Sequence, residues 1–404
     1  MSKLPLGWEI GYLGDEDIVN VIMGQSPLSS TYNDKGIGLP FLQGKAEFGE
    51  IYPSPIFSCS NPIKIAEKND LLLSVRAPVG DVNIALFKSC IGRGLVAIRA
   101  KDDKINYLFL FYYLKYSKNL FDSLSMGSTF KAITKKEIDK FQILLPPLPE
   151  QEKIAEVLST VDQAIEEINE ATTKMERLKK GLMQELLTKG IGHSEFKETE
   201  IGRIPKEWKI TRLGDKSIVE IRGNKAINSF NEAAFIPMEA IPSSDIFAKF
   251  EIRSKKNIKS FTYCKPGDIL LAKITPSLEN GKQGIVPNNI PYDFALATTE
   301  VFPIFCKNIE KLFLFYILKH TKFRNKIIAS MIGTTGRQRA SKISILNLLI
   351  PLPPLPEQNR IAEIFSTVDE RIQLLKEKRG KLERVKKGLM NELLTGRKRV
   401  KVEA

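Results

Sequence analysis

Apolar residues in two stretches of this chain recur at spacings of three and four positions, a pattern typical of one face of an α-helix. The stretches lie within residues 145–188 and 352–395, and their other positions are mostly Glu, Lys, Gln and Arg, which favour helices. Each stretch predicts a helix of roughly 38 residues, about 57 Å long. The two stripes consist of Ile154, Leu158, Val161, Ile165, Ile168, Met175, Leu178, Leu182 and Leu186, and of Ile361, Phe365, Val368, Ile372, Leu375, Leu382, Val385, Leu389 and Leu393.

The two predicted helices are near-copies of each other. The first segment is LPPLPEQEKIAEVLSTVDQAIEEINEATTKMERLKKGLMQELLT and the second is LPPLPEQNRIAEIFSTVDERIQLLKEKRGKLERVKKGLMNELLT, at a constant offset of 207 residues from 145 to 352. Pro149 and Pro356 suit helix starts, and Gly190 and Gly396 follow the expected helix ends. A narrow stripe on so long a helix needs a partner, so we predict that the copies form an antiparallel coiled coil. The alternative is that each stripe packs separately onto its own domain.

Shorter echoes in the same order extend the duplication to the whole chain. Trp8 and Trp208 each precede a Leu-Gly-Asp, and Asp70 and Asp268 each precede an apolar run followed by a proline. We therefore predict an α/β fold class with two mixed α/β domains separated by two long antiparallel helices, as an internal pseudo-two-fold repeat. The expected divisions are residues 1–145, 146–190, 191–351 and 352–404.

The two variable domains combine short apolar runs with turn-rich connections. Strands are expected at residues 71–75, 82–87, 94–98, 269–274 and 299–305. Short apolar helices are expected at residues 106–117 and 310–320, and loops at 24–44 and 275–292.

The composition adds a strong basic charge, with a net charge of +14 and a pI of about 9.4. This charge favours an acidic polymer as partner, and a solvated basic surface without a polyanion is the alternative. The four cysteines are scattered and there are only two histidines, so we predict no metal site. The sequence shows no signal-peptide core and no run of about 18 apolar residues, so we expect a cytoplasmic protein that does not span a membrane.

Motifs for catalysis are largely missing. The sequence contains no GxxxxGK[ST], no GxGxxG that opens a helix, and no Asn-Pro-Pro-Tyr or Asp-Pro-Pro-Tyr of the amino-methyltransferases. Glu207-Trp208-Lys209 superficially resembles half of a nuclease site, but its counterpart Glu9-Ile10-Gly11 lacks the lysine. We therefore predict neither catalytic residues nor a cofactor on this chain.

Basic and polar residues in loops are the candidates for binding nucleic acid. Lys, Ser and Thr suit phosphate contacts, whereas Arg and Gln can bind guanine or adenine edges with two hydrogen bonds. Any single candidate is more often a solvated charge, and the cluster at residues 337–339 is the strongest. The candidates are Arg76, Ser128, Thr129, Lys131, Lys135, Lys136, Lys273, Lys282, Thr334, Thr335, Arg337, Gln338 and Arg339.

Over its whole length the chain resembles the specificity subunit of type I restriction–modification systems. The phrases LPPLPEQxxIAE and KKGLMxELLT, each present twice, carry most of this resemblance. Gly24-Gln25-Ser26-Pro27 also resembles the start of a target recognition domain. The second half departs from that pattern with Arg222-Gly223-Asn224-Lys225, which adds Arg222 to the DNA-binding candidates.

The resemblance implies that each half reads one part of a bipartite target in double-stranded DNA. The helices would set the spacer and dock two methyltransferase subunits, and restriction (motor) subunits would join to cut. S-adenosylmethionine, ATP and magnesium would bind to those partners, and this chain would be non-catalytic. Two alternatives remain: a coiled-coil protein-interaction scaffold without DNA sequence specificity, and a self-sufficient nuclease or methyltransferase.

Overall fold

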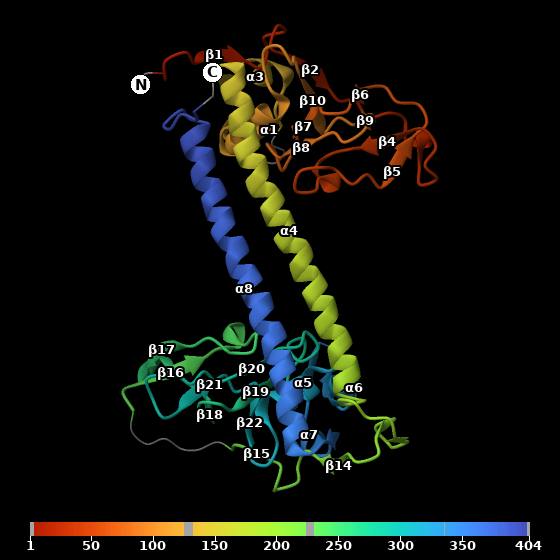
Figure 1. Ribbon diagram of the computed structural model, residues 1–404, viewed down its shortest axis with the longest axis vertical. Coiled ribbons are helices and arrows are strands. Elements are labelled where there is room, and N and C mark those ends of the chain that lie inside the picture. The colour runs from red at the N-terminus through yellow and green to blue at the C-terminus, as the bar shows by residue number, and fades with distance from the viewer. Residues whose placement is uncertain (1–3, 125–131, 224–229, 335, 402–404) are drawn as a thin grey trace. The chain divides into compact units, whose positions relative to one another are not determined.

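A computed structural model of the chain describes residues 4–124, 132–223, 230–334 and 336–401 (Figure 1). The chain divides into two compact units: unit 1 is residues 1–169 with 377–404, and unit 2 is residues 170–376. Two 39-residue helices, α4 (Leu148–Leu186) and α8 (Leu355–Leu393), contain the division points, so each unit holds part of each helix. The predicted class of mixed α/β domains with two long helices is confirmed.

Unit 1 combines β-sheets with short helices. Its elements before α4 are β1 (Glu9–Tyr12), β2 (Val19–Met23), η1 (Ser29–Thr31), β3 (Tyr32–Asn33), β4 (Leu39–Leu42), η2 (Lys45–Glu47), β5 (Phe57–Cys59), β6 (Ile65–Ala66), β7 (Leu71–Ser74), β8 (Val82–Ile84), β9 (Ser89–Ile91), β10 (Leu95–Ala100), α1 (Tyr107–Tyr116), α2 (Lys118–Leu124), α3 (Lys135–Asp139) and β11 (Gln142–Leu145). One sheet has the strand order β2-β10-β7-β8 and is antiparallel. A second has the order β3-β5-β4-β9-β6, in which β4 and β9 are parallel, and β1 pairs with β11.

Unit 2 repeats this plan. Its elements between the long helices are β12 (Phe196–Lys197), β13 (Ile204–Pro205), β14 (Lys209–Arg212), β15 (Val219–Ile221), β16 (Glu232–Ile236), η3 (Met238–Ala240), β17 (Glu251–Ser254), η4 (Lys255–Asn257), β18 (Thr262–Cys264), β19 (Ile269–Ala272), β20 (Gln283–Ile285), β21 (Ala295–Ala297), β22 (Val301–Cys306), α5 (Lys311–Lys319), α6 (Thr321–Ala329), β23 (Ile332–Thr334), β24 (Arg337–Arg339), α7 (Lys342–Leu346) and β25 (Leu349–Leu352). The sheet β15-β22-β19-β20 corresponds to β2-β10-β7-β8, and the pair β14–β25 to β1–β11. The sequence repeat is therefore also a structural repeat.

The expected strands and short helices are found within a few residues of their predicted positions. The two predicted loops are wrong in part, because residues 24–44 contain β3 and β4 and residues 275–292 contain β20. A hydrophobicity pattern did not indicate β20 because Gln283 within it is polar. The Gln283 side chain is nevertheless fully buried, and its amide is satisfied by donating to the Phe315 carbonyl (2.7 Å) and accepting from Arg324 (2.8 Å).

A glutamate in the first turn of each long helix anchors the tryptophan of its unit. In unit 1, the Trp8 indole donates to Glu150 (3.1 Å), and Arg399 forms an ion pair with the same carboxylate (2.6 Å). In unit 2, the Trp208 indole donates to Glu357 (2.9 Å), which also contacts a ring nitrogen of His193 at 2.8 Å. The glutamate of the Pro-Glu-Gln motif is thus the acceptor for the indole in both copies, fully buried in unit 1 and half-buried in unit 2.

The glutamine of the same motif joins each long helix to the short helix of its unit. The Gln151 side chain accepts from the amide of Asn106, the N-cap of α1 (2.9 Å), and donates to the Pro146 carbonyl (2.8 Å). Gln358 does the same in unit 2 with the amide of Glu310, the N-cap of α5 (2.9 Å). Because these contacts use backbone groups, the motif fixes the helix starts without constraining the neighbouring side chains.

Glycines just beyond the long helices let the chain turn sharply beside each tryptophan. Gly190 and Gly396 have φ values of 68° and 70°. A Cβ on Gly190 would lie 2.5 Å from the Glu357 carboxylate, and one on Gly396 would lie 2.4 Å from Pro5. Both the positive φ and the lack of space require glycine at these positions.

One tyrosine, one aspartate and one lysine fasten the domain of unit 1 to both long helices. Asp162 of α4 accepts a hydrogen bond from the Tyr112 hydroxyl of α1 (2.9 Å) and forms an ion pair with Lys386 of α8. Only 6% of the aspartate side chain and 13% of the lysine side chain are exposed. Burial and the neighbouring Asp162 raise the pKa of Tyr112, so this hydroxyl is a donor at neutral pH.

Unit 2 has the equivalent cluster, with the roles of the long helices exchanged. Asp369 of α8 accepts from the Tyr316 hydroxyl of α5 and pairs with Lys179 of α4, whose ammonium lies 5.3 Å from the centre of the Tyr316 ring. In each cluster the lysine and the aspartate come from different helices. Neither helix alone can therefore supply the cation that its largely shielded carboxylate needs.

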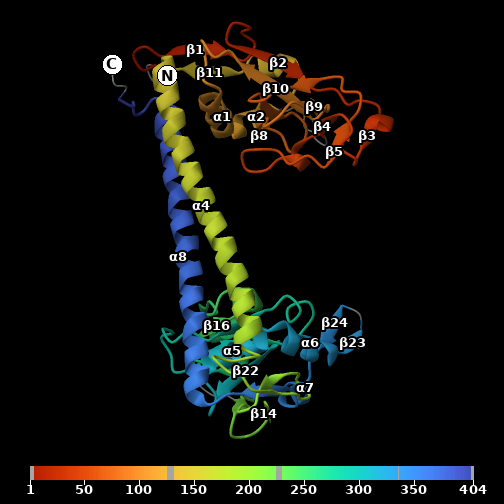
Figure 2. The same cartoon turned by 45° about the vertical axis from the view of Figure 1, so that its right-hand side comes forward.

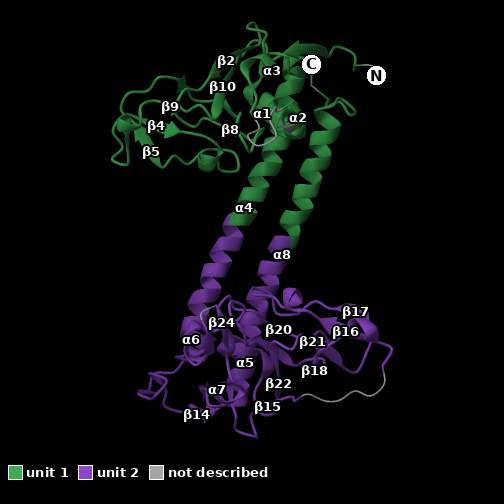
Figure 3. Ribbon diagram, turned by 180° about the vertical axis from the view of Figure 1, so that it is seen from behind, with its two compact units in different colours: residues 1–169, 377–404 green, residues 170–376 purple. Residues whose placement is uncertain are grey.

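The predicted helix-pair residues fall into two groups. Ile154 and Leu158 lie in the core of unit 1 together with Leu393, whereas Ile361 and Phe365 lie in the core of unit 2 with Leu182 packed against it. Because α8 ends in the core where α4 begins, while Lys386 of α8 pairs farther along with Asp162, the two helices run antiparallel within unit 1 (Figure 3). The other predicted residues are the buried Ile165, Ile168, Val368 and Ile372 and the half-buried Val161, Met175, Leu375, Leu382 and Leu389.

The two apolar stripes are not buried along their whole length. Leu178 and Val385, which occupy equivalent positions in the two copies, are 49% and 50% exposed.

Replacing Lys386 by Met should lower the free energy of unfolding of unit 1 by about 3 kcal/mol, because Asp162 would then be a buried charge without its cation. Urea unfolding followed by Trp8 fluorescence measures the change, with Trp208→Phe as a common background so that only unit 1 is observed.

The matched control is Arg379→Met, which removes an exposed ion pair with Glu383 one helical turn away on α8, also within unit 1. We expect this control to change stability by less than about 0.5 kcal/mol. Equal effects of the two variants would show that the buried pair contributes no more than a surface pair.

Candidate nucleic-acid interface

Strands β23 and β24 form a two-stranded antiparallel hairpin in unit 2 (Figure 2). Its second strand is bonded to the turn that follows β19. The Thr275 amide donates to the Gln338 carbonyl (3.1 Å), and the Ala340 amide donates to the Lys273 carbonyl (2.8 Å). These bonds bring the predicted candidate Lys273 beside the predicted cluster at residues 337–339.

Most of the hairpin is exposed. Ile332 is 76% exposed, Thr334 and Arg337 are also exposed, and Gln338 is half-buried. Gly333 has a φ of 140°, and a Cβ there would lie 2.6 Å from the Arg337 carbonyl oxygen. Glycine is thus required at position 333 for the two strands to pair.

An ion pair fastens the hairpin to the sheet. The Arg339 guanidinium donates to the Glu300 carboxylate (2.8 Å) while its side chain stays 64% exposed. The Glu300 carbonyl also accepts from the Lys273 amide (3.0 Å). The second Glu300 carboxylate oxygen is buried and has no hydrogen-bond partner among the residues that the structure describes.

Two predicted DNA-binding candidates in unit 2 already bind other residues of that unit. Arg222 pairs with the buried Asp268 (2.6 Å) and is only 18% exposed, and the Lys282 ammonium donates to the Met238 carbonyl (2.7 Å). Burial raises the pKa of Asp268 although the Arg222 guanidinium opposes that shift. These partners lie 46 and 44 residues away in sequence, so no local pattern could indicate them.

Unit 1 presents the corresponding candidates around the turn after β7 and around α3. Arg76 is exposed and forms an isolated β-bridge with Ala132. Lys135 pairs with Asp139 one helical turn away (2.9 Å), and Lys136 is exposed. An open hollow of about 570 Å³ is lined by Tyr12, Gly14, Asp15, Lys135, Lys136, Asp139 and Lys140. The candidates Ser128, Thr129, Lys131 and Thr335 lie outside the described residues.

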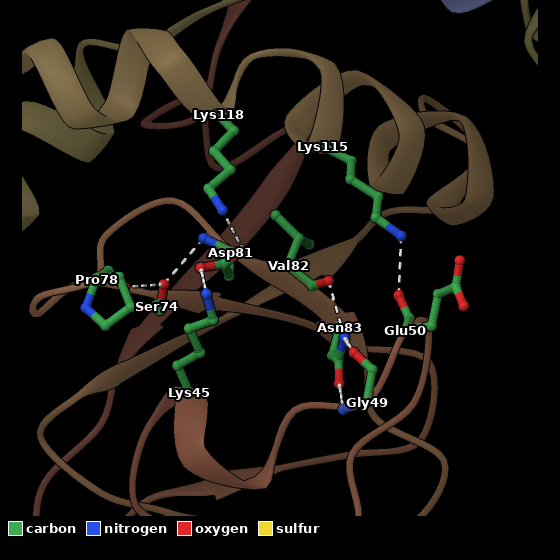
Figure 4. A network of polar contacts seen from close by, with 10 residues as sticks. All are labelled: Lys45, Gly49, Glu50, Ser74, Pro78, Asp81, Val82, Asn83, Lys115 and Lys118. Atoms are coloured by element: carbon green, nitrogen blue, oxygen red, sulfur yellow. Dashed lines mark hydrogen bonds and ion pairs between the residues drawn. The ribbon is translucent and has the colours of Figure 1, made fainter. Parts of the chain in front are cut away.

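Asp81 stabilises the turn between β7 and β8, which carries Arg76 (Figure 4). It pairs with Lys45 of η2 (2.6 Å) and with Lys118 of α2 (2.5 Å), and its amide donates to the Ser74 hydroxyl (2.9 Å). Burial tends to raise the pKa of Asp81, but the two lysines outweigh it and the pKa lies below its usual value.

The same network holds the loop that follows η2. The Asn83 side chain exchanges two hydrogen bonds of 3.0 Å with the backbone of Gly49, and the Lys115 ammonium donates to the Glu50 carbonyl (2.8 Å) (Figure 4). Sequence reasoning missed this network because its members are ordinary polar residues that come from five separate elements, η2, β7, β8, α1 and α2, and the loops between them. Their spacing in sequence carries no recognisable motif.

The described residues offer little to hold a metal or a reactive thiol. They contain no group of three or more His, Cys, Asp or Glu residues positioned to bind a metal ion. Burial raises the pKa of the Cys90 and Cys306 thiols to about 12 and also raises that of Cys264. Among the described helices, none is long and apolar enough to cross a membrane.

A family model and similar known proteins indicate the same family. The family model described as "Type I restriction modification DNA specificity domain" matches residues 5–177 and 205–384. The putative type I restriction enzyme MjaX specificity subunit of Methanocaldococcus jannaschii is 50% identical over 188 residues, 46% of this chain and 44% of that protein. The type I restriction enzyme MjaVIII specificity subunit of the same organism is 29% identical over 408 residues, 99% of this chain and 95% of that protein.

Solved structures share the fold at low sequence identity. The S subunit of a type I restriction–modification system from M. genitalium matches with a TM-score of 0.60 at 15% identity, covering 97% of each chain. A chain from a study of assembly and conformational transition of the type I R-M system matches with a TM-score of 0.58 at 18% identity, covering 98% of this chain and 99% of that one.

Replacing Asp81 by Asn should lower the free energy of unfolding at pH 7 by about 1 kcal/mol, because the aspartate pairs with two lysines. Its folded pKa lies below the unfolded value of 3.8, so its stabilisation is present above that pH and is lost as the pH falls through the folded pKa. Unfolding measured at pH 7 and pH 3 should therefore show a smaller difference between the two proteins at pH 3. A difference that grows in acid would contradict this assignment.

Proposed function

This chain belongs to the family of type I restriction–modification DNA specificity subunits, and we propose that each of its two units reads one half of a bipartite target in double-stranded DNA. The observation that carries the proposal is a repeated scaffold with different surfaces. The anchoring residues are the same in both units, including the Trp–Glu contacts and the Tyr–Asp–Lys clusters. Two equal scaffolds with different exposed residues suit the recognition of two different sequences.

The residues that differ lie at the candidate DNA-binding turns. Directly after the equivalent strands β7 and β19, unit 1 has Val75 and Arg76 where unit 2 has Lys273 and Ile274. The basic side chain is therefore displaced by one position, which in extended backbone moves it to the other face. Such a change alters the contact surface without altering the strands beneath it.

We propose that the exposed and half-buried candidates contact DNA and that the net charge of +14 supplies the general attraction to phosphate. Arg222 and Lys282 are the weakest candidates, because both are bound within unit 2. The remaining candidates in the described part of the chain are Arg76, Lys135, Lys136, Lys273, Thr334, Arg337, Gln338 and Arg339.

We further propose that α4 and α8 set the length of the DNA spacer and dock two methyltransferase subunits, which restriction subunits join. The partners would carry S-adenosylmethionine, ATP and magnesium, and they would perform methylation and cleavage in the cytoplasm. This chain would supply the DNA address and no catalytic group. The Tyr–Asp–Lys clusters support this role because they attach each domain to both helices.

Exchanging residues 201–349 for the same region of another family member tests whether each unit reads its own half. The exchanged chain, co-expressed with its methyltransferase partner, should methylate a motif with one new half, one old half and the same gap. Sequencing of methylated adenines in the host DNA gives the result. A change in both halves would refute independent reading by the two units.

Inserting four residues into one long helix tests the spacer role. The insertion adds about 6 Å, or about two base pairs, so the gap should lengthen while both half-sites stay the same. The same insertion between the exposed Asp102 and Asp103, in the turn between β10 and α1, is the control and should leave the gap unchanged. An altered half-site with an unchanged gap would refute the spacer model.

A further inference from the structure

The register of the β23–β24 hairpin sorts its residues onto two faces. Ile332 pairs with Arg339, Gly333 with Gln338 and Thr334 with Arg337. Directly paired residues of antiparallel strands point to the same face, and successive residues alternate. Arg337, Arg339, Thr334 and Ile332 therefore share one face, and Gln338 points to the other.

The two arginines on this face differ in their contacts. Arg339 is held by the Glu300 carboxylate (2.8 Å). Arg337 is exposed, and its guanidinium has no hydrogen-bond or ion-pair partner within the described part of the chain. One arginine is thus already engaged in fixing the hairpin, whereas no described residue engages the donors of the other.

Gln338 points to the second face of the hairpin. Its side chain is half-buried, and its backbone carbonyl accepts from the Thr275 amide (3.1 Å) at the base of the hairpin. Gln338 is therefore placed to support the ribbon, whereas Arg337 is placed to reach a ligand.

An exposed two-stranded ribbon suits a known mode of DNA recognition. The major groove admits a two-stranded β-ribbon, and arginine forms two hydrogen bonds with the O6 and N7 atoms of guanine there. Thr334, directly opposite Arg337, has a hydroxyl that can contact a base or phosphate. No acidic residue occurs between residues 332 and 342 to compete for the arginine.

From these contacts we infer that Arg337 reads a guanine in the half-site of unit 2, and that the Arg339–Glu300 ion pair positions the hairpin for this contact. The inference rests on the proposed function and adds to it the base and the residue that recognises it. It also separates the three residues at positions 337–339 into one base reader and two supports.

The test uses the complete complex of this chain with its methyltransferase partner. Methylation rates are measured on duplexes that carry each of the four base pairs at each position of the unit 2 half-site. The wild type should require a guanine at one position. Arg337→Gln should reduce discrimination at that position roughly 5- to 150-fold, the loss of one two-bond arginine–guanine contact, and leave the other half-site unchanged.

The matched control is Lys256→Gln, which removes the same charge from another exposed residue of unit 2, in η4. It should leave base discrimination at every position unchanged. Thermal unfolding and co-purification with the partner show that both variants are folded and assembled.

The positioning role of Glu300 has a separate readout. Glu300→Gln should weaken discrimination at the same base pair as Arg337→Gln, and the double variant should be no worse than Arg337→Gln alone. Residues that act through one contact are non-additive, whereas a general loss of stability would add to the effect of Arg337→Gln.

Three results would overturn the inference. Unchanged discrimination in Arg337→Gln would exclude a base contact, and an equal loss of rate on all duplexes would make Arg337 a phosphate contact only. A unit 2 half-site without any G·C pair would exclude a guanine reader. A wild-type complex that methylates no two-part sequence would instead remove the proposed function itself, and the inference with it.

Discussion

A carboxylate that is largely shielded from solvent on each long helix, Asp162 on α4 (6% exposed) and Asp369 on α8 (14% exposed), determines how the rest of its unit is assembled. Taking a carboxylate out of water costs several kcal/mol unless a cation and hydrogen-bond donors replace the water. Here the cation comes from the other helix and the hydroxyl from the domain, in the form of Lys386 with Tyr112 and of Lys179 with Tyr316. One polar cluster therefore joins three chain segments, and it forms only when both copies of the repeat are present.

The scaffold can stay constant while the loops vary because it holds the loops by their backbone. The Lys115 ammonium donates to the Glu50 carbonyl and that of Lys319 to the Ser243 carbonyl, both at 2.8 Å. Any residue supplies a carbonyl, so these contacts survive a change of loop side chains. The arrangement has an energetic cost, since burial and the charges of Lys179 and Arg324 lower the pKa of Lys319 to about 7.

The sequence predicts the parts of this structure that repeat at short intervals. The long helices follow from their apolar spacing, and strands such as β7 and β10, though not their pairing, follow from short apolar runs. The tertiary contacts could not be predicted, because Trp8 and Glu150 lie 142 residues apart and Arg399 and Glu150 lie 249 apart. Candidate DNA contacts were predicted by residue type, and only the structure separates the exposed Arg337 from Arg222, which is bound to Asp268.

The central claim is that this chain alone sets a two-part DNA address. The most direct test is to co-express the unaltered chain with its methyltransferase partner and to map methylated adenines across the host DNA by sequencing. The account predicts one motif made of two specific halves with a gap of fixed length. Methylation at a continuous motif, or at two halves with a variable gap, would contradict it.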